Sequence, residues 1–327
     1  MISIALVLLE NCFASSITGL IDAFEVANAH SARLPKSQNI PIRWALVSEK
    51  AGEQIRTHGG LTLNSQKSYQ DLGSFNIVYI PSIFYPGKKQ FSYWLEQQQE
   101  IIKYLVKLHS QGRTIAANCS GTFLLAEAGL LIDKAATTAW WLKHQFKRRY
   151  PNVNLDSKQI ITEQQSIICT GAMTSYHHLA MMLIEKYISP NIANLSAKTM
   201  LISRESMSQA PYVDLNIPID SQDEIVTNVM YWLENNLDKR VDFSALSNNL
   251  EISQRTLIRR FKKAVGMTPL NYLQNLRIQH AKNLLTQDSL SVEEVMALVG
   301  YQDPSAFFRL FKQRTGVSPS HYRKAFK

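Results

Sequence analysis

One stretch decides the fold of the C-terminal part of the chain: GYQDPSAFFRLFK at positions 300–312, which GVSP closes at positions 316–319. Gly300 permits a tight turn, because glycine adopts backbone conformations that other residues avoid. Asp303 has the side chain to cap a helix, and Pro304 is tolerated in the first turn that follows. The stretch therefore predicts a turn and then a helix that ends near Gly316.

The predicted helix has two different faces. Phe307 and Phe311 recur at helical spacing together with Leu310, so we expect these three side chains to face a core. The other face carries Ser305, Arg309 and Lys312. A helix that is held by its apolar face offers these small and cationic side chains to an acidic partner.

A second copy of this pattern lies earlier in the chain. FKKAVGMTP at positions 261–269 and FKQRTGVSP at positions 311–319 align without a gap, 50 residues apart. A short helical pattern and a turn precede each copy, at 242–252 and 292–300. Ser253 is the expected cap of the earlier helix, and Gly266 its end. A short helix, a turn and a capped second helix form a helix-turn-helix, so the sequence predicts a tandem pair of them.

The earlier copy is richer in arginine. On its predicted helix, residues 254–265, an apolar stripe predicts a buried face made of Leu257, Phe261, Ala264 and Val265. The opposite face carries Gln254, Arg255, Ile258, Arg259 and Lys262. Arginines on such a face can contact guanine edges or phosphates in a major groove, so we expect double-stranded DNA as the partner.

Ile258 and three further residues fit the same expectation. Ile258 and Phe308 occupy positions from which apolar side chains can contact thymine methyl groups. Arg260 and Lys263 flank the exposed face and are better suited to phosphate. The alternative is a basic helical bundle that binds another protein.

A long helical pattern at residues 270–285 separates the two motifs. Its 16 or so residues would form a rod of ~24 Å. Such a rod can space two recognition helices by about one turn of DNA, ~34 Å, so that they enter successive major grooves.

Charge and cysteine content narrow the class of protein. The net charge is +9, and 15 of the 35 Lys and Arg residues but only 10 of the 26 Asp and Glu residues follow Gln222. This basic excess suggests a polyanionic partner for the C-terminal part, although a solvated basic surface has the same composition. Cys12, Cys119 and Cys169 lack metal-binding or disulfide-framework spacing, so we expect no metal and no cofactor.

The opening apolar run, residues 4–9, is too short for a signal peptide or a membrane span. We therefore expect no membrane association and a cytoplasmic location. Its composition is typical of a strand that is buried on both faces of a parallel sheet.

Strand and helix patterns alternate through the first two hundred residues. This alternation predicts an α/β fold, an open and mostly parallel sheet with helices on both sides. The expected strands are 2–9, 41–47, 77–81, 114–118 and a hairpin of 160–162 with 166–170. The expected helices are 17–29, 91–111, 123–129, 173–188 and 192–201.

Cys119 lies at the junction of a predicted strand and a predicted helix, between Asn118 and Ser120. A sharp turn there would expose the thiol, and the start of a helix would lower its pKa. Ser120 and Gly121 are small enough to allow the turn. The alternative is a small residue buried at a tight junction, and the sequence leaves both interpretations open.

The N-terminal part resembles the PfpI/ThiJ-type, class I glutamine-amidotransferase-like fold. The resemblance rests on AANCSG at 116–121, FLLAEAGLL at 123–131 and ATTAWW at 136–141. Enzymes of that superfamily pair the cysteine with a glutamate and a histidine, where this chain has Ser16 and Ser120. Ser82 and Ile83 replace their Gly-Gly pair. The resemblance therefore implies a non-catalytic domain with Asn118, Cys119 and Ser120 as ligand-binding candidates.

The rival to this interpretation is a cysteine-dependent hydrolase or amidase that carries a DNA-binding tail. His177 or His178 would have to supply the missing base in such an enzyme. Helix packing is the alternative role for both histidines.

The C-terminal part, 223–326, resembles the AraC/XylS-type DNA-binding domain. Gly266 and Pro269, Gly316 and Pro319, and Arg277 are among the matching residues. The two resemblances together imply a transcriptional regulator with a sensor domain at 1–207, a linker at 208–222 and a DNA-binding domain at 223–327. They further imply an unidentified small-molecule effector and a homodimer formed through the N-terminal domain. A third interpretation is an architectural DNA binder without a ligand.

Overall fold

The computed structural model describes residues 2–35, 39–204, 208–214, 223–287 and 289–327. The chain divides into two compact units, Met1–Gln209 and Ala210–Lys327. Residues 205–207 of the predicted first domain and residues 215–222 of the predicted linker lie outside the described residues.

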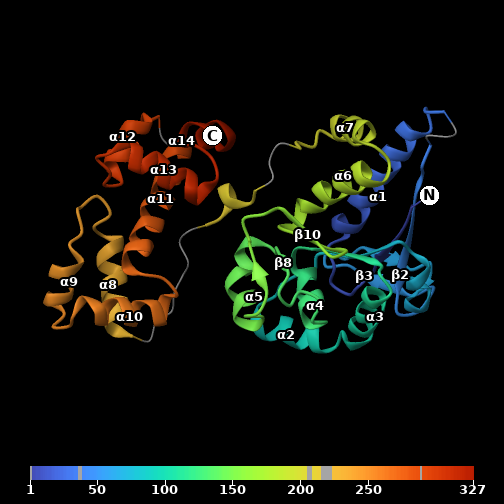
Figure 1. Ribbon diagram of the computed structural model, residues 1–327, viewed down its shortest axis with the longest axis horizontal. Coiled ribbons are helices and arrows are strands. Elements are labelled where there is room, and N and C mark those ends of the chain that lie inside the picture. Colours follow the sequence, from blue (N-terminus) through green and yellow to red (C-terminus); the bar gives the residue numbers. More distant parts are fainter. Residues whose placement is uncertain (1, 36–38, 205–207, 215–222, 288) are drawn as a thin grey trace. The chain divides into compact units, whose positions relative to one another are not determined.

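An open sheet forms the centre of the first unit (Figure 1). Among the described residues it has seven strands in the order β10-β11-β7-β6-β1-β2-β5. Neighbouring strands are parallel except for the antiparallel hairpin β10–β11. The strands are β1 Ile2–Val7, β2 Ile42–Ser48, β5 Lys67–Ser68, β6 Ile77–Ile80, β7 Thr114–Asn118, β10 Ile161–Gln164 and β11 Ile167–Thr170. Two small pairs, β3 Gln54–Arg56 with β4 Thr62–Asn64 and β8 Ala135–Ala136 with β9 Asn154–Leu155, lie outside it.

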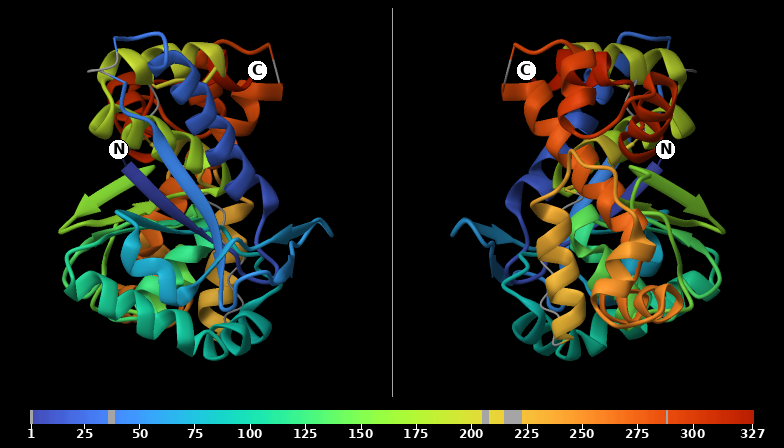
Figure 2. Two further views of the ribbon diagram at one scale, coloured as in Figure 1. Left: turned by 90° about the vertical axis from the view of Figure 1, so that its right-hand side faces the viewer. Right: turned by 90° about the vertical axis from the view of Figure 1, so that its left-hand side faces the viewer.

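Helices cover both faces of this sheet, which confirms the predicted α/β fold. Figure 1 shows α1, α6 and α7 on one side and α2, α3, α4 and α5 on the other, and the turned views of Figure 2 show α1 beside α6 and α7. The helices are α1 Ala14–Ser31, α2 Lys88–Glu96, α3 Gln99–Ser110, α4 Thr122–Glu127, α5 Lys143–Arg149, α6 Tyr176–Tyr187 and α7 Pro190–Thr199.

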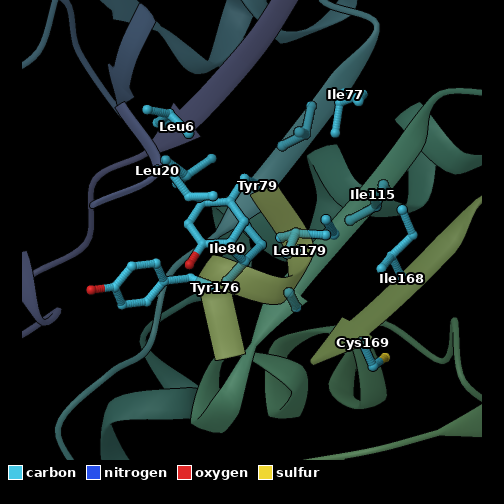
Figure 3. Packing of buried hydrophobic residues seen from close by; sticks show 14 of the residues in the cluster. Leu6, Leu20, Ile77, Tyr79, Ile80, Ile115, Ile168, Cys169, Tyr176 and Leu179 are labelled. Atoms are coloured by element: carbon cyan, nitrogen blue, oxygen red, sulfur yellow. The ribbon is translucent and has the colours of Figure 1, made fainter. Parts of the chain in front are cut away.

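The core lies between these layers. Figure 3 shows Leu20 of α1 and Leu179 of α6 packed over Leu6 and Tyr79 of the strands, all of which are buried. Apolar residues on both faces of β1 and β6 allow both layers of helices to bury their inner surfaces against the sheet.

The predicted single helix over residues 91–111 is wrong. The structure has two helices there, α2 and α3, which are separated at Gln97 and Gln98. Gln98 leaves the helical conformation, and its side-chain amide donates to the carbonyl oxygen of Trp94 at 3.1 Å. The run from Glu96 to Glu100 contains no apolar side chain that packing could hold in a continuous helix.

The second unit is helical throughout its described residues. Its helices are α8 Glu224–Glu234, α9 Phe243–Asn249, α10 Gln254–Val265, α11 Pro269–Gln287, α12 Val292–Leu298, α13 Pro304–Thr315 and α14 Pro319–Phe326. In Figure 1, α11 runs from the group α8, α9 and α10 to the group α12, α13 and α14. With 19 residues, α11 is ~28 Å long at 1.5 Å per residue.

The long helix α11 belongs to two separate cores. Its residues up to Leu276 pack with Leu257 and Phe261, whereas its residues from Ile278 onward pack with Phe307 and Phe311. Each helix-turn-helix therefore has a core of its own, and α11 connects the two.

Arg277 joins the two halves at the point where the cores meet. Its Nε donates to the carbonyl oxygen of Leu237 at 2.8 Å, and its Nη2 donates to that of Lys239 at 2.6 Å. On the other side its guanidinium lies 5.3 Å from the centre of the Tyr301 ring. Gly300 has a φ of +77°, and a Cβ there would lie 2.6 Å from the carbonyl oxygen of Leu237. The backbones of the two halves therefore approach closely at this point.

The described residues at the start of the second unit, 210–214, pack within that unit. The ring of Tyr212 lies 5.0 Å from that of Phe326, and the Nζ of Lys282 donates to the carbonyl oxygen of Val213 at 2.6 Å. Lys282 is only 4% exposed, and burial lowers the pKa of its amine from 10.5 to about 8. Its Nζ also lies 5.6 Å from the centre of the Tyr322 ring.

Candidate functional site

The helix α10 has defined ends and one buried stripe. The Ser253 hydroxyl accepts a hydrogen bond from the backbone N–H of Thr256 at 3.2 Å, and Gly266 ends the helix with a φ of +79°. Leu257, Phe261 and Val265, four residues apart, are buried. Ala264, which the sequence placed in the buried face, is exposed, because it lies outside this stripe.

The helix α13 repeats this design 50 residues later. The Asp303 carboxylate accepts from the backbone N–H groups of Ser305 at 3.0 Å and Ala306 at 3.1 Å, and Gly316 ends the helix with a φ of +81°. The buried residues, which are Phe307, Phe311 and Thr315, occupy the same register as those of α10. The gapless alignment of the two sequence copies thus corresponds to two equivalent helices.

The predicted DNA-facing residues gather on one face of each helix. On α10, Gln254, Arg255, Arg259 and Lys262 are exposed and Ile258 is half-buried. On α13, Ser305, Arg309 and Lys312 are exposed, and Phe308 is 36% exposed. Two cations recur at the same register, Arg259 with Arg309 and Lys262 with Lys312.

The cations on these faces have no partner among the described residues. Within the described part of the chain, no hydrogen bond or ion pair engages the side chains of Arg255, Arg259, Lys262, Arg309 and Lys312. A long cationic side chain without an internal partner remains available to an external anion.

Two other arginines have structural roles instead. Arg260, which the sequence assigned to phosphate, donates twice to the Asp223 carboxylate, with both N–O distances at 2.8 Å, and this interaction lowers the pKa of Asp223. Arg314 of α13 donates to the side-chain oxygens of Asn271 and Gln274, each at 3.2 Å. Arginine is therefore bonded within the protein at positions 260 and 314, whereas the arginines on the exposed faces of α10 and α13 have no partner among the described residues.

In the first unit, the junction after β7 makes the predicted sharp turn. Cys119 has a φ of +55°, in the left-handed region that few residues other than glycine adopt. A Cβ on Gly121 would lie 2.3 Å from the carbonyl oxygen of Pro81, so only glycine allows this approach.

The environment of the Cys119 thiol contradicts one of the two interpretations of the sequence. Cys119 is 3% exposed, and burial raises the pKa of its thiol to about 11, which outweighs the hydrogen bonds that lower it. The expectation of an exposed thiol with a lowered pKa is therefore wrong. The structure instead shows the buried small residue, because the surrounding segments close over the junction.

The neighbours of Cys119 already hold protein partners. The Ser120 hydroxyl accepts from the backbone N–H of Ile83 at 2.8 Å and donates to its carbonyl oxygen at 2.5 Å. The Asn118 amide donates to the Ser82 hydroxyl at 2.6 Å and to the carbonyl oxygen of Met173 at 2.8 Å. A ligand at Asn118, Cys119 and Ser120 would have to displace these bonds.

The residues that would have to assist catalysis are also held internally. The hydroxyl of the buried Ser16, at the position of the enzymes' glutamate, donates to the carbonyl oxygen of Phe13 at 2.8 Å. His177 packs against Tyr176, with 4.2 Å between the ring centres, and burial lowers its pKa.

Sequence reasoning missed a cavity in the first unit. It has a volume of about 370 Å³ and lies between α2, the start of α4 and α5. Phe91, Leu95 and Phe123 provide an apolar lining, and Lys88, Arg148 and Arg149 provide cations. The run KHQFKRR at positions 143–149 was the signal that could have indicated it.

The described residues offer neither a metal site nor a membrane-spanning helix. No group of three or more His, Cys, Asp and Glu side chains could hold a metal ion in these ranges. No described helix has both the length and the apolar composition that crossing a membrane requires.

Family models match both parts of the chain. The DJ-1/PfpI family model matches residues 4–186, and a helix-turn-helix domain model matches residues 246–325. The first match covers more than half of the chain.

Curated relatives show the same combination over almost the whole length. The chain is 25% identical to the HTH-type transcriptional regulator CdhR of Pseudomonas aeruginosa over 312 residues, which is 94% of this chain and 88% of that protein. It is 23% identical to the HTH-type transcriptional regulator GbdR of the same species over 325 residues, which is 98% of this chain and 84% of that protein.

A solved structure agrees with the fold of the first unit. The crystal structure of a ThiJ/PfpI family protein from Pseudomonas syringae superposes with a TM-score of 0.50 at 12% identity. The superposition covers 68% of this chain and 78% of that one.

Proposed function

Because the chain belongs to the DJ-1/PfpI family and ends in an AraC-type tandem helix-turn-helix domain, we propose that it is a transcriptional regulator that binds specific sequences of double-stranded DNA. CdhR and GbdR, with which it aligns over 94% and 98% of its length, are HTH-type transcriptional regulators. We further propose that its first unit responds to a small-molecule effector.

One observation carries the DNA-binding proposal. Two capped helices 50 residues apart expose cations at matching positions, and none of these cations is engaged by the described part of the protein. A basic bundle that binds another protein would not require this repetition. Two successive major grooves of DNA fit such a repeat, because they have the same shape and are lined by the same phosphate backbones.

The two helices have different roles in this proposal. The exposed face of α10 carries Arg255 and Arg259 with Gln254, side chains that can form bidentate hydrogen bonds with base edges. The face of α13 has only Ser305, Arg309 and Lys312 with the apolar Phe308, which suits phosphate contacts and a thymine methyl group. We therefore assign base recognition mainly to α10 and anchoring mainly to α13.

The first unit is proposed as a sensor without catalysis. A thiol with a raised pKa supplies little thiolate at neutral pH, and its expected partners are replaced or internally bonded. A homodimer through this unit and a cytoplasmic location complete the proposal. Light scattering on the full chain tests the dimer, since a mass near twice 37.2 kDa is expected.

Salt dependence of DNA binding is the main test. The full chain is offered a pool of genomic fragments, and the affinity for the selected site is measured at several salt concentrations. If the five cations of each bound protomer all neutralise phosphates or lie close to them, the slope of log K against log salt approaches about −4.5 per protomer. Arg259→Ala should lower the affinity for the selected site by about 10- to 100-fold and relax the sequence preference.

Arg260→Ala is the matched control. Because Arg260 is paired with Asp223, its loss should lower the melting temperature slightly and leave the sequence preference unchanged. Binding that does not respond to salt, or the same loss of affinity in both variants, would contradict the proposed interface.

A further inference from the structure

We propose that the cavity between α2, α4 and α5 is the effector site, and that it takes a small organic carboxylate with a flat apolar body. This inference rests on the proposed function, because it identifies where and what the first unit senses. It places the effector away from the buried junction at Cys119.

The size and lining of the cavity fit a small molecule. Its volume of about 370 Å³ lies within the range of ~300–1,000 Å³ that ligand pockets occupy. Phe91, Leu95 and Phe123 are buried side chains that line it, and the Phe91 and Phe123 rings meet edge to face at 5.2 Å between centres. Such an aromatic wall suits a planar apolar group.

The charge of the cavity calls for an anion. Lys88, Arg148 and Arg149 line it, and none of the ten lining residues is acidic. Arg149 is held by Glu127, with the Nη2 and Oε1 atoms 2.5 Å apart. In the part of the chain that the structure describes, no hydrogen bond or ion pair engages the side chains of Lys88 and Arg148. Two cations therefore remain for a ligand carboxylate, and an arginine can bind it through two parallel hydrogen bonds.

The remaining polar residues of the lining add no further positive charge to the cavity. Burial and the neighbouring Lys143 and Lys147 lower the pKa of His144, so this imidazole is neutral at pH 7 and adds no charge. With Arg149 balanced by Glu127, the free charge in the cavity comes from Lys88 on α2 and Arg148 on α5.

The junction at Cys119 offers less to such a ligand. Asn118, Cys119 and Ser120 are at most 3% exposed. The side chains of Asn118 and Ser120 already form hydrogen bonds with other groups of the protein. A carboxylate would also meet no cationic side chain among these three residues.

Benzoate and its neutral analogue benzamide provide the test on the full chain. We expect saturable binding of benzoate by isothermal titration calorimetry and at least tenfold weaker binding of benzamide. Arg148→Gln should weaken benzoate about tenfold, since one charge-assisted contact is lost. Lys89→Gln, which removes an exposed cation of α2 outside the cavity lining, is the matched control and should bind benzoate as the wild type does.

Hydrogen exchange locates the ligand independently of the variants. Benzoate should slow amide exchange in Lys88–Glu96 and Lys143–Arg149 and leave the junction at residues 118–121 unchanged. Equal affinity for benzoate and benzamide, no effect of Arg148→Gln, or protection confined to the junction would overturn the assignment. Each of these results can occur while DNA binding is intact, whereas loss of salt-dependent DNA binding would count against the proposed function instead.

Discussion

Cys119 shows how the environment of a residue decides its chemistry. The strand-to-helix junction and the small neighbours were visible in the sequence, and the left-handed φ of +55° confirms the sharp turn. The pKa of about 11 was not visible, because it results from burial by segments far away in the chain. Ser82 and Ile83, which bond to Asn118 and Ser120, lie more than thirty positions earlier.

The raised pKa predicts that the Cys119 thiol reacts slowly with alkylating reagents. Because a free cysteine has a pKa near 9.0 and Cys119 one of about 11, the thiolate fraction at pH 8 is lower by ~100-fold. Alkylation by iodoacetamide, followed by mass spectrometry, should therefore label Cys119 slowly in the native chain. Protein unfolded in urea is the control and should label at Cys12, Cys119 and Cys169.

The same residue separates the regulator from the enzyme. Cys119→Ser should leave DNA affinity unchanged, because the thiol takes no part in the proposed interface. Rapid labelling of the native thiol, together with an amide hydrolysis that the serine variant loses, would establish the enzyme alternative instead.

At the level of elements, the sequence predicted helices most accurately where the cap, the apolar stripe and the terminal glycine all indicated the same bounds. The caps at Ser253 and Asp303, the apolar stripes and the glycines at 266 and 316 all indicated the same two helices, and the structure has both. The pattern over residues 91–111 misled because helical spacing continued across Gln97 and Gln98, where packing no longer supports a helix. The basic run at 143–149 indicated at most the charge of the cavity beside α2, and its place could not be predicted, since the place depends on how α2 and α5 approach in space.

The close approach at Gly300 leads to a prediction about how much the contact between the two helix-turn-helix halves contributes to stability. Gly300→Ala would force a residue with a side chain into a φ of +77° and place its Cβ 2.6 Å from the carbonyl oxygen of Leu237. The strain alone should cost about 1–2 kcal/mol, and the contact adds to it. Urea unfolding of the full chain measures the loss of stability of the second unit.

Gly266→Ala is the matched control for this measurement. Gly266 has nearly the same φ, +79°, but a Cβ there would meet nothing within 4 Å. We expect Gly300→Ala to destabilise more than Gly266→Ala and to reduce DNA affinity as well. Equal effects of the two substitutions would mean that the contact with Leu237 contributes nothing.

At the level of the whole molecule, Lys282 of α11 fixes the start of the second unit, because its amine donates to the carbonyl oxygen of Val213. Folding lowers the pKa of this lysine from 10.5 to about 8, so the folded state loses its proton first as the pH rises. The unfolded state then binds more protons, and this lysine makes the second unit more stable between pH 8 and about pH 10.5. Below pH 8 the amine is charged in both states and this gain is absent.

The comparison with Lys282→Met isolates this effect from other titrating groups. The difference in melting temperature between the wild type and Lys282→Met should shift in favour of the wild type as the pH rises from 8 to 10. Lys324→Met, which removes an exposed lysine of the same unit, should show no such shift. A pH-independent difference for Lys282→Met would contradict the lowered pKa.

The contact at Arg277 has a consequence for the DNA sequences that the protein can bind. Since α11 and Arg277 fix the separation of the two recognition helices, the protein cannot adjust to binding boxes at variable distances. Regulated promoters should therefore carry two short boxes whose centres lie one helical turn apart, about 10–10.5 base pairs. One inserted base pair between the boxes would turn the second box away from α13, so spacing should be as invariant among target promoters as the bases themselves.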